Sequence, residues 1–447
     1  MRLPRRRTLW IAAALVAVVG AVVAWIMLPP RALGFAGGRT VELAAYQGPS
    51  PVGAPPELAS ADIVARGKYL AQAADCVVCH TTSGGQPYAG GAAFPTPFGV
   101  LYSPNITGDR ATGIGGWTDA EFLRAVHQGI GKDGQHLYPA FPYESYTLMT
   151  DADVLAIKAY LLSLSPVRSV PPPTRLNFPF NQRWLMAFWA AFYSPNQRFR
   201  PHPDRSPEWN RGAYLVEALE HCGDCHTPRN LGQALDNRQK FAGALTGGWR
   251  AYNITGDPAS GVGAWSDPAL IQYLREGHAD GHGAAGGPMG EVVGASLSQL
   301  TPGDVAAIVA YLRSVPAIRS AGLPAPVTQP ASDMPRLMPA SFDPRGKQIF
   351  EGACASCHSW SGVSLLTNDA TLTGDRAVND PSAINVAQIV LAGGGRPGAT
   401  VRMPAFGAAY SDSEIAAVAN YVTARFGGAP GRITTADVAQ LRRSSVH

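Results

Sequence analysis

Cys76-Val77-Val78-Cys79-His80 is one of three Cys-x-x-Cys-His pentapeptides in the chain, the others lying at Cys222–His226 and Cys354–His358. This pattern is the attachment signature of a c-type haem. Two thiols on one helical turn can form thioethers with both vinyl groups of a porphyrin, and the adjacent His can ligate the iron. One copy would also fit a zinc half-site, a redox dithiol or chance, but the three copies use all six cysteines. We therefore expect three covalent haem c groups, held by Cys76, Cys79, Cys222, Cys225, Cys354 and Cys357, with His80, His226 and His358 as iron ligands.

The sequence around the pentapeptides also repeats. An Arg-Gly pair precedes each copy, at Arg66-Gly67, Arg211-Gly212 and Arg345-Gly346. The stretch Asn105-Ile106-Thr107-Gly108-Asp109 recurs 148 residues later as Asn253-Ile254-Thr255-Gly256-Asp257. Helix N-cap patterns, a Ser or Thr with an acid three residues on, begin at Thr150, Thr301 and Ser411. A period of roughly 140 residues indicates domains rather than a solenoid. Each repeat resembles a class I cytochrome c domain, which predicts an all-α fold of three such domains in tandem.

The N-terminus carries an export signal. Arg2, Arg5, Arg6 and Arg7 precede an uncharged stretch from Leu9 to Leu28. Twenty helical residues span about 30 Å, the thickness of the hydrocarbon core. We expect an uncleaved transmembrane helix in the bacterial inner membrane, with the arginines in the cytoplasm and the haem domains facing the periplasm. The alternative is a signal peptide cleaved in the region from Ala32 to Gly38. Both alternatives export the haem domains, as covalent haem attachment requires.

These features divide the chain into eight segments. The predicted order is a transmembrane helix (1–30), a tether (31–60), domain 1 (61–170), an aromatic linker (171–209), domain 2 (210–320), a Pro-rich linker (321–341), domain 3 (342–430) and a polar tail (431–447). The aromatic linker is expected to contain a helix that packs across the first two domains. Its alternative role is a docking surface for a partner or for the membrane interface.

Each haem iron has a second axial position, which Met, His or an open site can occupy. Met403 stands in a Met-Pro segment just before the last N-cap, and Met289 precedes the cap at Thr301; we expect both to be ligands. His278 and His282 are the rivals of Met289. The 148-residue offset carries Met289 back to Phe141, which cannot ligate iron. For haem 1 we therefore expect Met149, with His127, His136 and an open site as alternatives.

The sequence does not support two other classes of function, nucleic-acid binding and catalysis at a substrate site of the chain's own. The net charge is only +4, and no lysine-rich run with interleaved aromatics occurs, so nucleic-acid binding is unsupported. The chain also shows no dinucleotide fingerprint and no nucleophile–base pattern. We expect no substrate site of its own.

The chain is similar to the triheme cytochrome c subunit of bacterial membrane-bound dehydrogenases. The resemblance covers about residues 60–430 and rests on the three haem pentapeptides, the repeated segments, His136-Leu137-Tyr138-Pro139-Ala140-x-Pro142-Tyr143 and Trp209-Asn210-Arg211-Gly212-Ala213-Tyr214-Leu215. Many relatives have Met where this chain has Phe141. The resemblance implies an electron-transfer subunit. Its partners would be a catalytic subunit of the PQQ, flavin or molybdenum type, which oxidises alcohols, aldehydes, sugar acids or N-heterocycles, and ubiquinone or a terminal oxidase as acceptor. The alternative is a self-sufficient multihaem oxidoreductase, of the peroxidase or thiosulfate dehydrogenase type.

Overall fold

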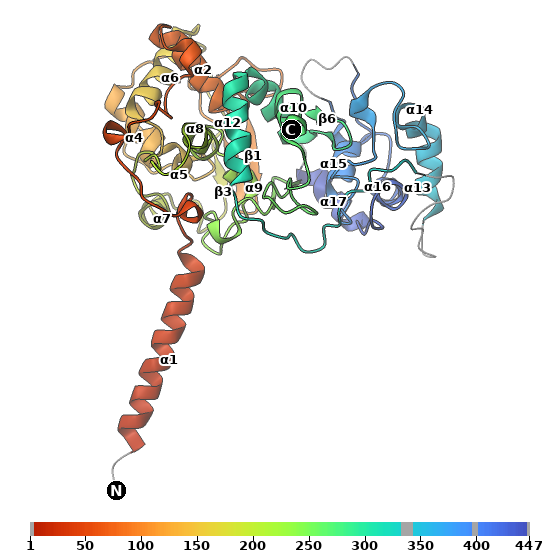
Figure 1. The fold of residues 1–447 in the computed structure, drawn as a ribbon, viewed down its shortest axis with the longest axis horizontal. Helices are drawn as coiled ribbons and strands as arrows, with labels where there is room; N and C mark the ends of the chain where they lie inside the picture. Colours follow the sequence, from red (N-terminus) through yellow and green to blue (C-terminus); the bar gives the residue numbers. More distant parts are fainter. Residues whose placement is uncertain (1–3, 332–342, 396–400, 445–447) are drawn as a thin grey trace.

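Three helical repeats form the body of the protein, and helix α1 (Pro4–Met27) projects away from it (Figure 1). The computed structural model describes residues 4–331, 343–395 and 401–444. We refer to residues 61–170, 210–320 and 342–430 as the first, second and third repeats. In Figure 1 they follow one another from the orange side of the molecule to the blue side.

The first and last helices of each repeat pack against each other. The pairs are α2 (Ile63–Ala73) with α6 (Asp151–Ser163), α8 (Pro207–Tyr214) with α12 (Pro302–Arg313), and α13 (Pro344–Ile349) with α16 (Asp412–Phe426). The glycine of each repeated Arg-Gly pair lies at the contact. A Cβ atom on Gly67, Gly212 or Gly346 would stand 1.8, 1.9 or 2.3 Å from a carbonyl oxygen of the partner helix. Because only glycine allows this approach, the pair recurs in all three repeats.

The haem pentapeptides lie on short helical turns just after each first helix. These are α3 (Cys76–Cys79), α9 (Gly223–His226) and α14 (Ala355–His358), with wider turns η4 (Leu215–Leu219) and η7 (Phe350–Cys354) leading into the last two. The remaining α-helices of the described residues are α4 (Asp119–Gln128), α5 (Tyr143–Tyr146), α7 (Leu185–Tyr193), α10 (Asp267–Glu276), α11 (Gly287–Ala295), α15 (Ile384–Ala392) and α17 (Thr435–Ser444). The predicted N-caps are confirmed: the Thr150, Thr301 and Ser411 side chains each accept a hydrogen bond from the backbone N–H three residues on.

The prediction of an all-α fold is confirmed only in part, because short antiparallel strands join the helices. β1 (Ala93–Thr96), β2 (Gly99–Tyr102) and β3 (Arg175–Leu176) form one sheet, in which Phe94 pairs with Leu101 and Val100 with Arg175. β4 (Ala244–Thr246) pairs with β5 (Trp249–Ala251), and β6 (His278–Ala279) pairs with β7 (Gly283–Ala284). Strand pairing satisfies the hydrogen-bonding backbone groups of the long loops between helices. The helical periodicity of the sequence does not reveal these strands.

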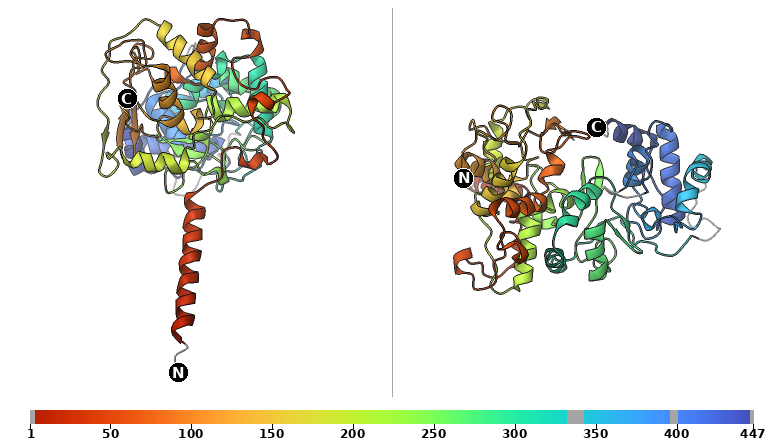
Figure 2. Two further views of the ribbon diagram at one scale, coloured as in Figure 1. Left: turned by 90° about the vertical axis from the view of Figure 1, so that its left-hand side faces the viewer. Right: turned by 90° about the horizontal axis from the view of Figure 1, so that it is seen from above.

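The first and second repeats share one hydrophobic core, whereas the third has a separate one. Residues from the N-terminal helix of each of the first two repeats reach the last helix of the other. Tyr69 Oη donates to Asp304, and Tyr214 Oη donates to Asp153. Figure 2 shows the third repeat, in blue, as a lobe beside the other two. It docks on the β4–β5 hairpin, where the Asn385 side chain exchanges two hydrogen bonds with the backbone of Arg250.

The segment expected to be a tether is fastened to the body. Val41 N–H donates to the Pro201 carbonyl, and Arg205 donates to the Ala36 carbonyl at 2.8 Å. Gly53 N–H donates to Asp153, 3.0 Å away. The segment therefore lies along the first two repeats. Of the expected Pro-rich linker, residues 332–341 lie outside the described part of the chain.

In the parts of the chain that the structure describes, no helix is long and apolar enough to cross a membrane. The side chains of residues 4–9 and 12 lie outside the described residues, and Leu9 and Ala12 belong to the expected span. The prediction of a transmembrane helix from Leu9 to Leu28 is therefore not confirmed.

Three candidate haem attachment sites

The three predicted proximal histidines are held in the same way. The Nδ1 atoms of His80, His226 and His358 lie 2.8, 2.5 and 2.7 Å from the backbone carbonyl oxygens of Pro104, Tyr252 and Ala370, respectively. Because a carbonyl oxygen can only accept, Nδ1 carries the ring proton and Nε2 keeps its lone pair. Metal-ligating histidines are commonly oriented by such a contact. The arrangement fits iron ligation through Nε2 at all three positions.

Sequence reasoning did not find these carbonyl groups, although the repeated Asn-Ile-Thr segment was a signal for two of them. Pro104 and Tyr252 directly precede the repeated asparagines. Asn105 Nδ2 donates to the Val167 carbonyl at 2.7 Å, and Asn253 Nδ2 donates to the Ile318 carbonyl at 2.6 Å. Each asparagine thus fixes the carbonyl-bearing loop to the chain that leaves the last helix of its repeat.

Burial keeps the site histidines neutral. It lowers the pKa of His80, His226 and His358 below the usual value of 6.5, against the opposing effect of their hydrogen bonds to the carbonyl oxygens. A neutral imidazole is the form that donates a lone pair to a metal. The histidines are therefore available for ligation near neutral pH.

The cysteines are positioned as thioether formation requires. Cys76 and Cys79 lie on the single turn α3, and all six cysteines of the chain are free. Burial, with a contribution from Asp75, raises the pKa of Cys76 to about 12. Burial also raises the pKa of Cys225 and Cys354 to about 11. Two thiols on one turn would supply the thioether links to haem c, and the neutral histidine that follows them would supply the iron ligand.

The first and second sites lie next to each other. Helix α5 of the first repeat packs against η4, and α11 of the second repeat packs against α3. Tyr146 on α5 donates to the Ala74 carbonyl at 2.6 Å, and its ring lies 5.4 Å from the His221 ring. Ala74 and His221 lie just before the first cysteines of the two pentapeptides. Helix α11 of the second repeat thus lies against the first haem turn, and α5 of the first repeat lies against η4, the turn that leads into the second haem turn.

Tyr252 joins the second site to the third repeat. Its carbonyl oxygen accepts from His226, while its hydroxyl lies 3.3 Å from Oδ2 of the buried Asp380. Asp380 also forms an ion pair with Arg250 at 3.0 Å. The residue that orients the second histidine is therefore also an interface residue.

The three candidate methionines occupy different environments. Met149 is 1% exposed and belongs to the core shared by the first two repeats. Met289 lies half-buried on α11 and packs against the same core. Met403 is half-buried against the core of the third repeat, and two backbone hydrogen bonds of 2.8 and 3.0 Å pair it with Gly394. Their ligation of iron stays a prediction.

The structural register agrees with the offset that relates Met289 to Phe141. The Leu137 N–H donates to the carbonyl of Gly129, and the Ala285 N–H donates to the carbonyl of Gly277. Each glycine ends the helix that precedes the loop, so the two loops close in the same way. Phe141 follows Leu137, and Met289 follows Ala285, by four positions. The Phe141 ring packs edge-on against Tyr146, with 5.5 Å between centroids.

The rival histidines of the second repeat have other contacts. The His282 ring stacks on the Trp265 ring with 3.8 Å between centroids, and His278 Nε2 lies 3.8 Å from Asp280 Oδ1. In the first repeat, His136 Nδ1 is buried without a hydrogen-bond partner in the described part of the chain.

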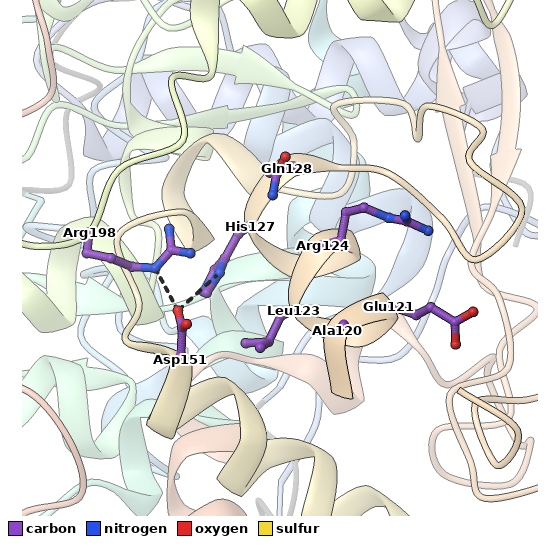
Figure 3. Close-up of a pocket in the computed structure, with 8 residues that line it drawn as sticks. All are labelled: Ala120, Glu121, Leu123, Arg124, His127, Gln128, Asp151 and Arg198. Atoms are coloured by element: carbon purple, nitrogen blue, oxygen red, sulfur yellow. Dashed lines mark hydrogen bonds and ion pairs between the residues drawn. The ribbon is translucent and has the colours of Figure 1, made fainter. Parts of the chain in front are cut away.

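His127 lines a pocket of about 400 Å³ between α4 and the start of α6 (Figure 3). Its Nδ1 lies 3.7 Å from Asp151, which also pairs with Arg198 at 2.9 Å. Burial, then the Arg198 charge, lowers the pKa of His127 to about 4. The ring is therefore neutral near pH 7, and Nε2 has no hydrogen-bond partner among the described residues.

Comparisons with known proteins agree with the geometry. The family model described as "Cytochrome c" matches residues 64–165 and 210–316, and the one described as "Cytochrome C oxidase, cbb3-type, subunit III" matches residues 343–422. The "Gluconate 2-dehydrogenase cytochrome c subunit" of Pantoea cypripedii is 38% identical, over 85% of this chain and 90% of that protein. The "Fructose dehydrogenase cytochrome subunit" of Gluconobacter japonicus is 40% identical, over 85% and 82%.

A third relative is longer. One of the nicotinate dehydrogenase subunits of Pseudomonas putida is 42% identical over 82% of this chain, and this chain spans only 30% of that protein. The similarity therefore concerns one part of a larger polypeptide.

Proposed function

The chain belongs to the family of dehydrogenase cytochrome c subunits, and from this premise we propose that it carries electrons from a catalytic dehydrogenase subunit to ubiquinone or a terminal oxidase. The cytochrome c domains imply covalently bound haem c. When bound, haem c supplies reversible one-electron chemistry at its iron. The chain's own residues attach, orient and insulate that group.

The observation that carries the proposal is the threefold Nδ1–carbonyl contact of His80, His226 and His358. Three separate loops supply the same acceptor, each to a histidine that directly follows a pair of cysteines. This regularity supports three haems per chain. Met149, Met289 and Met403 are the sixth ligands that we propose.

The packing of the repeats supports transfer between the sites. The first haem turn lies against α11 of the second repeat, and η4, which leads into the second haem turn, lies against α5 of the first. Tyr252 links the second site to the third repeat. The chain thereby holds its three sites in one body, which fixes the separations that electron transfer depends on.

We place the haem domains on the periplasmic side of the bacterial inner membrane, with α1 as the anchor. The support is the sequence of α1, in which arginines precede an uncharged stretch. A reporter fused after His447 should be extracytoplasmic. N-terminal sequencing that begins between Ala32 and Thr40 would replace the anchor with a cleaved signal.

The decisive experiment compares the purified chain with the complex from native membranes. Alcohols, aldehydes, sugar acids and N-heterocycles are added to each, and haem reduction is followed by absorbance. We expect one substrate class to reduce the haems of the complex and none to reduce those of the chain alone. Turnover by the chain alone near ~10 per second, with any of these substrates, peroxide or a sulfur donor, would favour a self-sufficient enzyme.

A further inference from the structure

The solvent side of helix α7 is made of large aromatic side chains. Trp184, Phe188 and Phe192, spaced four residues apart on one face of a helix, are 61%, 60% and 66% exposed. No charged residue occurs from Trp184 to Tyr193. Soluble surfaces rarely expose contiguous apolar patches of this kind without a binding role. We call Trp184, Phe188 and Phe192, with Leu231, the α7 apolar face.

The other side of α7 already packs on the body. Trp189 Nε1 donates to the Gly232 carbonyl at 2.8 Å, and the Trp189 ring lies 5.9 Å from Tyr143. The Tyr193 ring lies 5.3 Å from Trp189. The helix is thus fixed without its outer aromatic side chains, so the fold itself does not account for them.

The loop that holds α7 also holds the end of α1. Asn230 Nδ2 donates to the Met27 carbonyl at 3.1 Å, two residues from the Gly232 carbonyl that binds Trp189. Leu231, between these two contacts, is 80% exposed. The α7 apolar face is therefore continuous with the point where α1 leaves the body, and Figures 1 and 2 show α7 at that end of the molecule.

Basic and aromatic groups border the same surface. The Arg238 guanidinium lies 4.4 Å from the centre of the Trp25 ring and donates to the Ile26 carbonyl at 3.0 Å. Arg183 precedes Trp184 and lies 4.8 Å from the Tyr138 ring. Tryptophan favours the boundary between headgroups and acyl chains, and arginine pairs with lipid phosphates.

We propose that the α7 apolar face lies in the lipid headgroup–acyl boundary, as a second membrane contact beside α1. The proposal rests on the proposed anchoring of α1, which decides which side of the body meets the bilayer. The bound surface orients the body, because one helix axis alone leaves rotation and tilt free whereas a second contact restricts both.

The test uses the full haem-loaded chain in vesicles of phosphatidylcholine and phosphatidylglycerol that contain a photoactivatable diazirine lipid. Lipid adducts are located by peptide mass spectrometry. We expect adducts on α1 and on the peptide that contains Trp184, Phe188 and Phe192. In the variant Phe188→Glu/Phe192→Glu the α7 adducts should fall to background while the α1 adducts persist. An unchanged haem content will show that this variant folds.

The matched control is Leu365→Glu/Leu366→Glu, which changes two leucines of the third repeat that are 94% and 62% exposed. It should leave all adducts unchanged, and the wild-type peptide with these leucines should stay unlabelled. Labelling of α1 without α7 would overturn the proposal and leave the anchor intact. Labelling of neither would overturn both. Crosslinks between copies through α7, without lipid adducts, would assign the face to self-association instead.

Discussion

Tyr69 of the first repeat donates a hydrogen bond from Oη to Oδ2 of Asp304 in the second repeat, at 2.6 Å, across 235 residues of sequence. The relationship is reciprocal, because Tyr214 of the second repeat donates to Asp153 of the first at 2.5 Å. The third repeat has Gln348 at the equivalent position, two residues after the glycine of its Arg-Gly pair. It therefore lacks the tyrosine that makes these reciprocal hydrogen bonds. These buried contacts select the first two repeats as partners.

Tyr69→Phe should weaken this pairing. The substitution removes the only proton donor that Tyr69 offers to Asp304, although the Arg211 contacts at 2.6 and 2.7 Å remain. We expect a loss of about 1–3 kcal/mol of unfolding free energy, measured by urea denaturation of the haem-loaded chain. Tyr214→Phe should behave alike. Tyr102→Phe, on β2, is the control and should leave stability unchanged; equal stability of all three variants would contradict the pairing role.

Cys79→Ala should leave two haems per chain. The substitution removes one thioether at the first site, and the other two sites are attached by their own cysteines. Pyridine haemochrome assay against protein concentration checks the count, and Cys225→Ala and Cys357→Ala should give the same number. A wild-type count below three would refute the assignment of all three pentapeptides.

Met149→Ala should remove one of three sulfur–iron bonds. The near-infrared sulfur-to-iron band of the oxidised protein should then lose roughly a third of its intensity, by the rule of one axial sulfur per haem. Met289→Ala and Met403→Ala should each do the same. Phe141→Met should change the intensity of this band little if Met149 already ligates the first haem iron. An unchanged band in Met149→Ala would exclude it, and the iron spin state would then distinguish an open site from His127 or His136.

Asn253→Ala should alter the second haem selectively. It releases the loop whose Tyr252 carbonyl orients His226, and so weakens a hydrogen bond that increases the basicity of the ligand. The reduction potential of that haem should rise by some tens of millivolts, on the order of the ~1 kcal/mol of a neutral hydrogen bond. Spectroelectrochemical titration resolves the three haems. Asn105→Ala should shift only the first; a uniform shift of all three would point to general loosening.

Asp109→Asn should destabilise the first repeat in a pH-dependent way. The Thr112 hydroxyl and amide hold the pKa of Asp109 below its usual value. A lowered folded-state pKa contributes stability above the unfolded pKa, near 3.8, which is lost as pH falls through the folded value. The variant should therefore unfold more easily than wild type at pH 7, with the difference closing as the pH falls below 3.8. Asp133→Asn, on an exposed turn, is the control; a difference that does not depend on pH would contradict this account.

The sequence predicted the candidate haem ligands because their chemistry is local. Two cysteines and a histidine lie within five residues, so one turn of helix brings them together whatever surrounds it. The capping residues Thr150, Thr301 and Ser411 were predictable for the same reason, since a cap contacts an amide three residues away. The Arg-Gly repeat was visible, but its cause, the helix contact at Gly67, Gly212 and Gly346, was not.

What only the tertiary structure decided depends on groups far apart in the chain. The carbonyls that orient His80 and His226 lie 24 and 26 residues beyond them. The repeated asparagines mark the loops that bear these carbonyls, but any residue type supplies a carbonyl, so the sequence does not show that they contact the histidines. The Tyr69–Asp304 contact, the docking of the third repeat on Arg250, and the place of α7 beside the end of α1 likewise have no local signature. The sequence by itself determined where the three candidate haem attachment sites lie, because each pentapeptide consists of neighbouring residues. The fold decided how these sites are oriented and joined, because those contacts form only when distant loops pack.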